Sequence, residues 1–295
     1  MGIIRSASFT NTEDNINIVI DGNCPGIVIE SVDGIYAFQG EVITSPYSQT
    51  SGDRYKNTRA PRRNIVVQGK IFADFWDNRQ LMYRVFRLGS LGRFCYTEPD
   101  HSNRYADYYV ESVEIDQDPY RGQYQISLIC PDPFFYDGSN EVVDLAAWEA
   151  DFIFEHDFLE SPGEELGHRE TTMIQEVQNL NGVDGIGMKI VMTATGNVTN
   201  PYVYLYETGE RITIGTTDNP YTLDSTKQVT VDTTTGKKNI VQLVSNTETR
   251  INEYLDPDSV FFQLWAGTNT IGYNAASGAE YLNVHIEYKM RYLGV

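Results

Sequence analysis

The stretch LNVHIEYKMRY, residues 282–292, decides the fold class of the C-terminal half. Apolar and polar residues alternate along its whole length, and the apolar set is Leu282, Val284, Ile286, Tyr288, Met290 and Tyr292. A period of two is the side-chain period of a β-strand, in which one face is buried and the other is solvated. The stretch therefore predicts one strand over 282–292 that lies on a core.

Further strands are predicted upstream of it, each rich in β-branched or aromatic residues and bounded by turn residues. They cover residues 188–192, 201–206, 211–214, 228–232 and 240–243. Short strands at such regular intervals are typical of a β-sandwich or barrel. We therefore expect a β-sandwich in the second half of the chain.

The first half also reads as strands, at 16–20, 26–30, 64–71 and 123–130, with one helix among them. The helix is expected at Asp74–Leu88, because Leu81, Met82, Val85 and Phe86 share one stripe of a 3.6-residue period. Asp77 with Gln80 resembles a capping box, and Gly89 follows the helix.

A long polar connection separates two of these strands, from Ser45 to Arg63. Connections of this length are functional or disordered in compact domains, so it is either a hairpin arm that reaches a neighbouring subunit or a flexible loop. Its basic residues are candidate interface residues, and they are Arg54, Lys56, Arg59, Arg62 and Arg63.

Two prolines, Pro131 and Pro133, end the strand pattern of the first half, since proline cannot donate to a sheet ladder. Residues 141–176 then hold 11 acidic residues and one basic residue, with a short apolar strand expected at 152–154. We therefore divide the chain into a first domain at 1–138, an acidic connector at 139–170 and a second domain at 171–295.

Composition excludes several classes of protein. The formal net charge is −19, so a nucleic-acid-binding role is disfavoured, because phosphate binding needs clustered Lys and Arg. The N-terminus lacks the apolar segment of a secretory signal and no run is long enough to span a membrane, so we expect synthesis in the cytoplasm and no membrane association. The three cysteines, Cys24, Cys95 and Cys130, lie far apart and are expected to be reduced core residues.

No catalytic constellation stands out, so we do not expect an enzyme, a cofactor or a metal. The four histidines have no second ligand at metal-binding spacing, and nucleophile-elbow, phosphate-loop and zinc-protease motifs are absent. A glycosidase would need only two carboxylates, and the tightest pairs are Asp116 with Asp118 and Asp256 with Asp258. We interpret both pairs as turns, because proline follows an aspartate in each.

A sugar-binding module is the other alternative, because exposed aromatic rings on a sandwich can stack on sugars. The candidates are Trp265, Tyr202, Tyr204 and Tyr206. We favour instead a core position for these rings, since alternate aromatic residues on strands commonly face the core.

Several motifs in the same order resemble the distal tail proteins of siphophages. In the first half they are QGKI (68–71), a helix with Arg79 and Leu81, and ICPDPFFY (129–136). In the second half they are YETGE (206–210), VDTTTGKK (231–238), FQLWAGTN (262–269) and YKMRYLGV (288–295).

This resemblance implies a mostly β protein, with an N-terminal split β-barrel carrying one helix, like a tail-tube subunit, and a C-terminal galectin-like β-sandwich. It implies a homo-hexameric ring in the virion, at the phage tail tip. The ring would join the tail tube protein to tail-tip or receptor-binding proteins, and DNA would pass through it without specific binding. The alternative that remains open is a carbohydrate-binding adhesion module of the tail tip.

Overall fold

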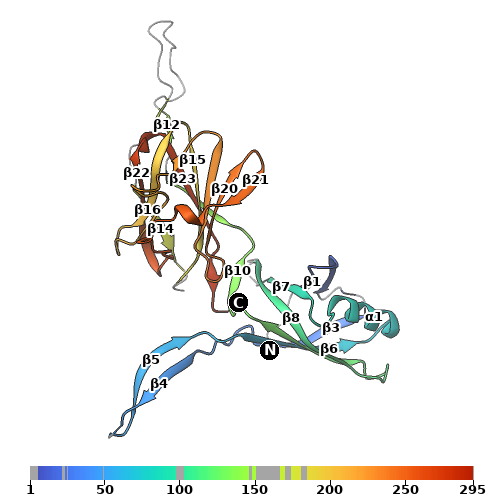
Figure 1. Cartoon of the computed structure of the whole chain (residues 1–295). Coiled ribbons are helices and arrows are strands. Elements are labelled where there is room, and N and C mark those ends of the chain that lie inside the picture. The colour runs from blue at the N-terminus through green and yellow to red at the C-terminus, as the bar shows by residue number, and fades with distance from the viewer. Residues whose placement is uncertain are drawn as a thin grey trace. The chain divides into compact units, whose positions relative to one another are not determined.

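The computed structural model describes residues 6–21, 24, 26–48, 50–97, 103–145, 148–150, 167–169, 174–180 and 185–294. The chain forms two compact units (Figure 1). Unit 1 contains residues 1–138 and 291–295, and unit 2 contains residues 139–290. The mostly β class is confirmed, and the described residues contain a single α-helix.

Unit 1 is built on an antiparallel sheet whose main path runs in the order β2-β1-β7-β8-β9-β6-β3. Among the described residues, the two end strands of this path are not paired with each other, so the sheet is open. The short strand β10 pairs with β8 and β24. The bounds are β1 Ser6–Asn11, β2 Ile16–Asp21, β3 Ile27–Asp33, β6 Arg63–Ile71, β7 Leu91–Thr97, β8 Asn103–Ile115, β9 Gln123–Cys130, β10 Phe135–Asp137 and β24 Arg291–Tyr292.

The helix α1, Phe75–Val85, covers the core of this sheet with the predicted stripe. Met82, Val85 and Phe86 are buried and Leu81 packs against them. The predicted capping box is wrong, because the helix begins one turn earlier than that motif requires. Its N-cap is Asp74, which has a left-handed backbone and makes no side-chain cap.

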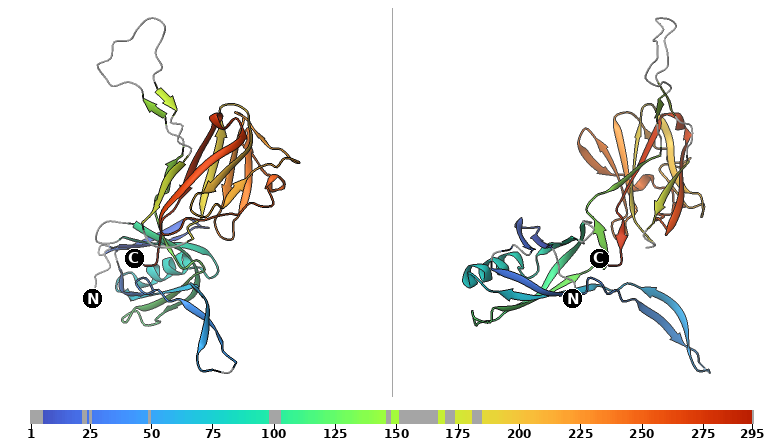
Figure 2. Two further views of the ribbon diagram at one scale, coloured as in Figure 1. Left: turned by 90° about the vertical axis from the view of Figure 1, so that its left-hand side faces the viewer. Right: turned by 180° about the vertical axis from the view of Figure 1, so that it is seen from behind.

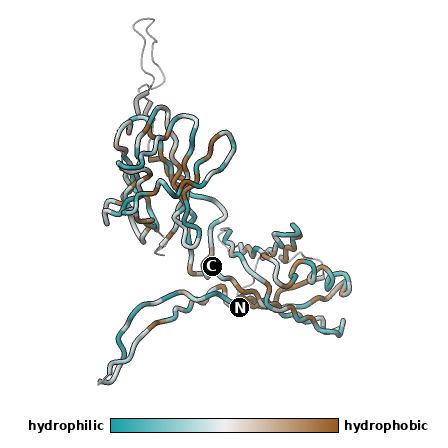
Figure 3. Tube along the Cα trace, in the orientation of Figure 1, coloured by the Kyte–Doolittle hydropathy of each residue, from teal (hydrophilic) through white to brown (hydrophobic). Residues whose placement is uncertain are grey.

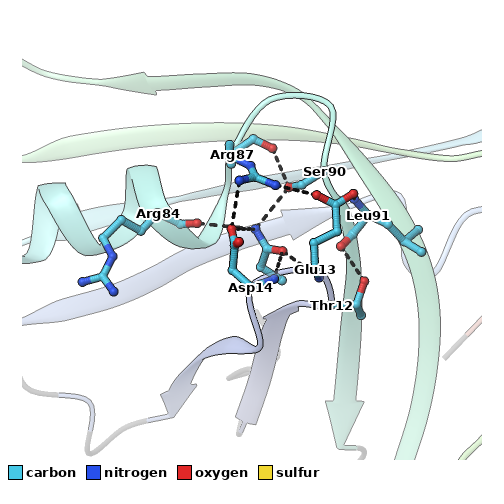
Figure 4. A network of polar contacts seen from close by, with 8 residues as sticks. Thr12, Glu13, Asp14, Arg84, Arg87, Ser90 and Leu91 are labelled. Carbon is cyan, nitrogen blue, oxygen red and sulfur yellow. Dashed lines mark hydrogen bonds and ion pairs between the residues drawn. The ribbon is translucent and has the colours of Figure 1, made fainter.

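Polar contacts fix the end of the helix to the turn between β1 and β2 (Figure 4). Arg87 forms ion pairs with Glu13 and Asp14. The fully buried Asn11 donates to the Ser90 hydroxyl at 3.2 Å. The helix end, the first hairpin and the start of β7 are therefore held as one piece.

Unit 2 is the expected sandwich. One sheet has the order β11-β23-β15-β19-β20-β21, the other has the order β14-β22-β16-β17 with β18 beside β16, and side chains of both sheets share one core. The bounds are β11 Glu141–Asp144, β14 Ile174–Asn179, β15 Met188–Ala194, β16 Val198–Leu205, β17 Arg211–Thr213, β18 Thr222–Leu223, β19 Lys227–Asp232, β20 Asn239–Val244, β21 Thr247–Arg250, β22 Gly267–Ser277 and β23 Leu282–Tyr288. Short 3-10 turns lie at Asn252–Tyr254 and Ala279–Tyr281.

The predicted strand over 282–292 is two strands instead. Its first part is β23, which pairs with β15 and β11 in unit 2. Its last part is β24, which pairs with β10 in unit 1, so residues 291–295 do not belong to the second domain as drawn from the sequence. The alternation continues across the break because the apolar residues of β23 are buried in unit 2 and Tyr292 of β24 packs against the core of unit 1.

The acidic connector also differs from its sequence-based outline. Its first residues form β11, which is an edge strand of unit 2, and β12 (Trp148–Ala150) pairs with β13 (Gly167–Arg169). The strand expected at 152–154 lies outside the described residues.

A glycine faces a tyrosine in three cross-strand pairs, where the ring lies over the bare backbone. A Cβ built on any of these glycines would approach the ring to less than 3 Å, so only glycine fits beneath it. The pairs are Gly69–Tyr124, Gly92–Tyr108 and Gly272–Tyr204. The motif recurs in both units and accounts for glycines inside strands, where they would otherwise be unfavourable.

Candidate assembly surfaces

The polar connection between Ser45 and Arg63 forms most of a β-hairpin, which we call the arm. It consists of β4 (Glu41–Pro46) and β5 (Asp53–Arg59), which pair only with each other. Gly52, with a φ of +103°, lies at the tip, where a residue with a side chain would be strained. Figure 1 shows the arm extending away from the sheet of unit 1.

The arm has no core of its own. Every side chain of β5 is exposed, and so is nearly all of β4. Its large apolar residues are also open to solvent, with Val42 at 58% and Tyr55 at 60% exposure. Figure 3 colours most of the arm as hydrophilic, interrupted by short hydrophobic stretches. A lone two-stranded hairpin is at best marginally stable in water, so the arm is suited to packing against another surface.

Four of the five predicted interface residues lie on or next to the arm and are exposed. Arg54, Lys56 and Arg59 are on β5, and Arg62 follows it. Arg59 pairs with Glu41 across the hairpin at 2.7 Å. Within the described ranges, Arg54, Lys56 and Arg62 make no ion pair, so their charges are available to a partner.

Arg63 is different, and its assignment to an interface is wrong. It is the first residue of β6 and only 6% exposed. Its guanidinium donates to the carbonyls of Pro133 at 2.7 Å and Gly34 at 2.6 Å, and also to that of Leu293. Burial lowers the pKa of this guanidinium, and the surrounding carbonyls replace the lost water. Arg63 therefore holds unit 1 together from within.

The C-terminal segment is fixed to unit 1 by the same kind of contact. Arg104 donates to the carbonyl of Gly294 at 3.0 Å and lies over the ring of Tyr292. Arg291 lies over the ring of Phe134, 3.7 Å from its centroid. These cation–π contacts and hydrogen bonds attach the last described residues of the chain to its first domain.

A groove lies beside α1 in unit 1, and we call it the α1 groove. It has a volume of about 690 Å³. The lining residues come from β3, β6, α1 and the β8–β9 hairpin, and they are Glu30, Gln68, Gly69, Arg79, Tyr83, 113–117 and 123–125. The nearby exposed face of the helix carries Trp76, which is 62% exposed. Nothing in the sequence marked this groove, because four separate segments build it.

The described residues offer no metal centre as an alternative to these surfaces. No group of three or more His, Cys, Asp or Glu side chains there could hold a metal ion. Both aspartate pairs are turns, as predicted, because Asp116 accepts from the backbone of Asp118 and Asp256 from that of Asp258. Nor does any helix among these residues have the length and apolar character to cross a membrane.

The core position expected for the tyrosines of unit 2 is wrong. On β16 the buried face belongs to Pro201, Val203 and Leu205, so Tyr202 and Tyr204 point to the outer face and are half-buried. Tyr206 and Trp265 are 68% and 52% exposed. The aliphatic residues of β16 occupy the core, and Tyr204 covers Gly272 of the neighbouring strand β22.

Comparisons with known proteins agree with this architecture. Residues 181–292 match the family described as the siphovirus-type tail component, C-terminal domain. No curated protein sequence matches the chain.

Two solved phage structures share this fold. The chain superposes on the Dit protein of phage SPP1, described as a paradigm of the hub adsorption apparatus in phages that infect Gram-positive bacteria, with a TM-score of 0.68 and 13% identity over 97% of this chain and 99% of that one. It also matches a chain of the phage p2 baseplate in its activated conformation with Ca, with a TM-score of 0.53 and 10% identity over 99% of this chain and 100% of that one. The resemblance to distal tail proteins is thereby confirmed.

Proposed function

We propose that this chain is a structural hub at the distal end of a phage tail, where six copies form a ring. The observation that carries the proposal is the arm, an exposed hairpin without a core of its own, on a chain with the fold of a tail hub protein. A ring of identical copies needs a heterologous contact, and an arm that leaves its own unit can supply one side of it.

In this role the ring joins the tail tube protein to tail-tip or receptor-binding proteins, and it resides in the virion after synthesis in the host cytoplasm. DNA would pass through without being held, and the net charge of −19 supports this because it repels phosphate. The role needs no catalytic group, which fits a chain that acts as a scaffold and not as an enzyme.

The mass of the full chain in solution tests the proposal. Multi-angle light scattering should give six times the chain mass, and negative-stain images should show six-membered rings. Deletion of residues 48–60 should yield a folded monomer, since it removes β5 with Arg54 and Lys56. A deletion variant that still forms hexamers would rule out the arm as the ring contact.

A carbohydrate-binding role is a second candidate, and the outward tyrosines favour it. Tyr204 and Tyr202 lie with ring centroids 6.1 Å apart on the outer face of unit 2, where rings could stack on a sugar. Glycan-array binding that is lost in Tyr204→Ala or Trp265→Ala would support adhesion. Absent binding would leave the hub as the only role, and binding unchanged in both variants would exclude these rings as the sugar site.

A further inference from the structure

We infer that the arm of one copy lies in the α1 groove of the next copy of this chain. The inference rests on the proposed ring and deepens it, because it names the surface that receives the arm. The arm and the groove are both parts of unit 1, and each is open in the isolated chain.

The positions of the two surfaces suit a head-to-tail contact. In Figure 1 the arm and α1 lie at opposite ends of unit 1, and the view from behind in Figure 2 shows the same separation. An arm cannot fold back on a groove at the other end of its own sheet. Complementary surfaces at opposite ends are what a heterologous contact requires, and such contacts form a ring when the rotation between copies closes.

The charges of the two surfaces are opposite. Residues 41–62 carry four basic residues against Glu41 and Asp53, a net charge of +2 in a chain of −19. The lining of the groove carries Glu30, Glu114 and Asp116 against one basic residue, a net charge of −2. Complementary charge orients a partner and sets its register.

Among the acidic residues of the α1 groove, Glu114 is the one most available to pair with a basic residue of the arm. It ends a row of paired residues that runs across β6, β9 and β8 as Gln68, Gln125 and Glu114. Gln68 and Gln125 are hydrogen-bonded to each other at 2.8 Å. Glu30 is paired with Lys70 at 3.0 Å, whereas Glu114 is exposed and makes no ion pair within the described ranges.

The groove also offers a donor and an aromatic wall. The Nε of Arg79 is buried and lacks a hydrogen-bond partner among the described residues. Its guanidinium lies within 6 Å of the ring centroids of Trp76 and Tyr83. A hairpin brings backbone carbonyls for such a donor, and exposed Val42 and Tyr55 can pack against the rings.

Carbodiimide cross-linking of the full chain tests the contact. The reagent joins a lysine amine to a carboxylate in direct contact, forming an amide while the departing oxygen leaves in the urea. With a mixture of 15N-labelled and unlabelled chains, we expect an amide between Lys56 and Glu114 whose two peptides differ in label. Lys56→Arg keeps the charge and should abolish this product, whereas Lys237→Arg should leave it unchanged.

Charge reversal gives a second measurement. Glu114→Lys should weaken ring assembly on the order of tenfold in concentration, and the exchange Lys56→Glu with Glu114→Lys should restore it. Glu248→Lys, on the exposed strand β21 of unit 2, is the matched control and should assemble like the unmodified chain.

The outcomes separate the inference from the proposed function. If the unmodified chain never forms rings, the proposed function fails. If rings form but Lys56 is cross-linked only to acids outside the groove, or Glu114→Lys weakens assembly no more than Glu248→Lys, the inference is overturned and the ring stands.

Discussion

The guanidinium of Arg63 donates a hydrogen bond to the carbonyl of Leu293, 230 positions further along the chain. The same side chain also donates hydrogen bonds to carbonyls of the segment after β3 and of the turn before β10. One buried cation therefore joins three distant segments of unit 1. The guanidinium makes hydrogen bonds to five carbonyls in these segments, whereas a lysine ammonium has only three N–H donors.

Replacement of Arg63 should destabilise unit 1. Arg63→Ala leaves several buried carbonyls without a donor, so we expect a loss of about 3 kcal/mol or more in the free energy of unfolding. Urea denaturation measures it. The adjacent, exposed Arg62 is the control, and Arg62→Ala should change the free energy by less than about 0.5 kcal/mol. Equal midpoints for the two variants would contradict the buried role.

Removal of residues 291–295 should resemble the loss of Arg63. The deletion removes β24 and the carbonyl acceptors of Arg63 and Arg104, so unit 1 should unfold at a lower urea concentration. When the deletion is combined with Arg63→Ala, the loss in the free energy of unfolding should be clearly smaller than the sum of the two separate losses. Both changes disrupt the same hydrogen-bond network. Fully additive losses would show that the two are independent.

Loss of the hydroxyl should destabilise unit 1 at one of its two glycine-covering tyrosines and not at the other. The Tyr124 hydroxyl donates to the Val28 carbonyl at 3.1 Å, so Tyr124→Phe should lower the free energy of unfolding by about 1 kcal/mol. The buried Tyr108 hydroxyl lacks a hydrogen-bond partner among the described residues, so Tyr108→Phe should leave stability unchanged or increase it. Thermal unfolding of both variants measures the difference, and a similar loss in both would contradict it.

Cys130 should make the protein sensitive to alkali. Burial raises the pKa of this thiol to about 12, because the thiolate is disfavoured in the core. In the unfolded chain the pKa is about 8.5. The protonated thiol therefore contributes its full share of stability at pH values below the pKa of the unfolded chain. This contribution is lost as the pH rises from there towards about 12. Cys130→Ala should flatten this slope of stability against pH, and an unchanged slope would assign it to other groups.

Truncation of the arm should leave unit 1 stable. Residues 44–56 contribute nothing to its core, so their replacement by a short turn should not shift the urea midpoint when it is compared with the unmodified chain at concentrations too low for assembly. Circular dichroism and urea titration of the monomeric variant measure this. A large loss of stability would show that the arm has a structural role within its own chain.

Sequence patterns predict the buried face of an element correctly where burial follows a local period. The alternation at 282–288 and the helical stripe of Met82 and Val85 each predict which face is buried, and the structure agrees. The polar, turn-rich composition of the segment from Ser45 likewise indicated a possible arm.

The same patterns failed where distant segments decide the outcome. Arg63 was grouped with the exposed cations before it, because nothing nearby in sequence shows that carbonyls from Gly34 and Leu293 surround it. The period of two along 201–206 was visible, but which face meets the core depends on the partner sheet. Tyr202 and Tyr204 therefore lie on the outer face, where Tyr204 covers Gly272, whereas we had expected them to face inward.

The return of the chain end to unit 1 has a consequence for synthesis on the ribosome. Residues 139–290 must be translated between β10 and its partner β24. At about 5–20 residues per second, this interval lasts roughly 8–30 s. Unit 1 is thus the first domain to emerge and the last to be completed. A prematurely terminated product would lack β24 and the Leu293 acceptor, so only full-length chains would complete the domain that carries the arm.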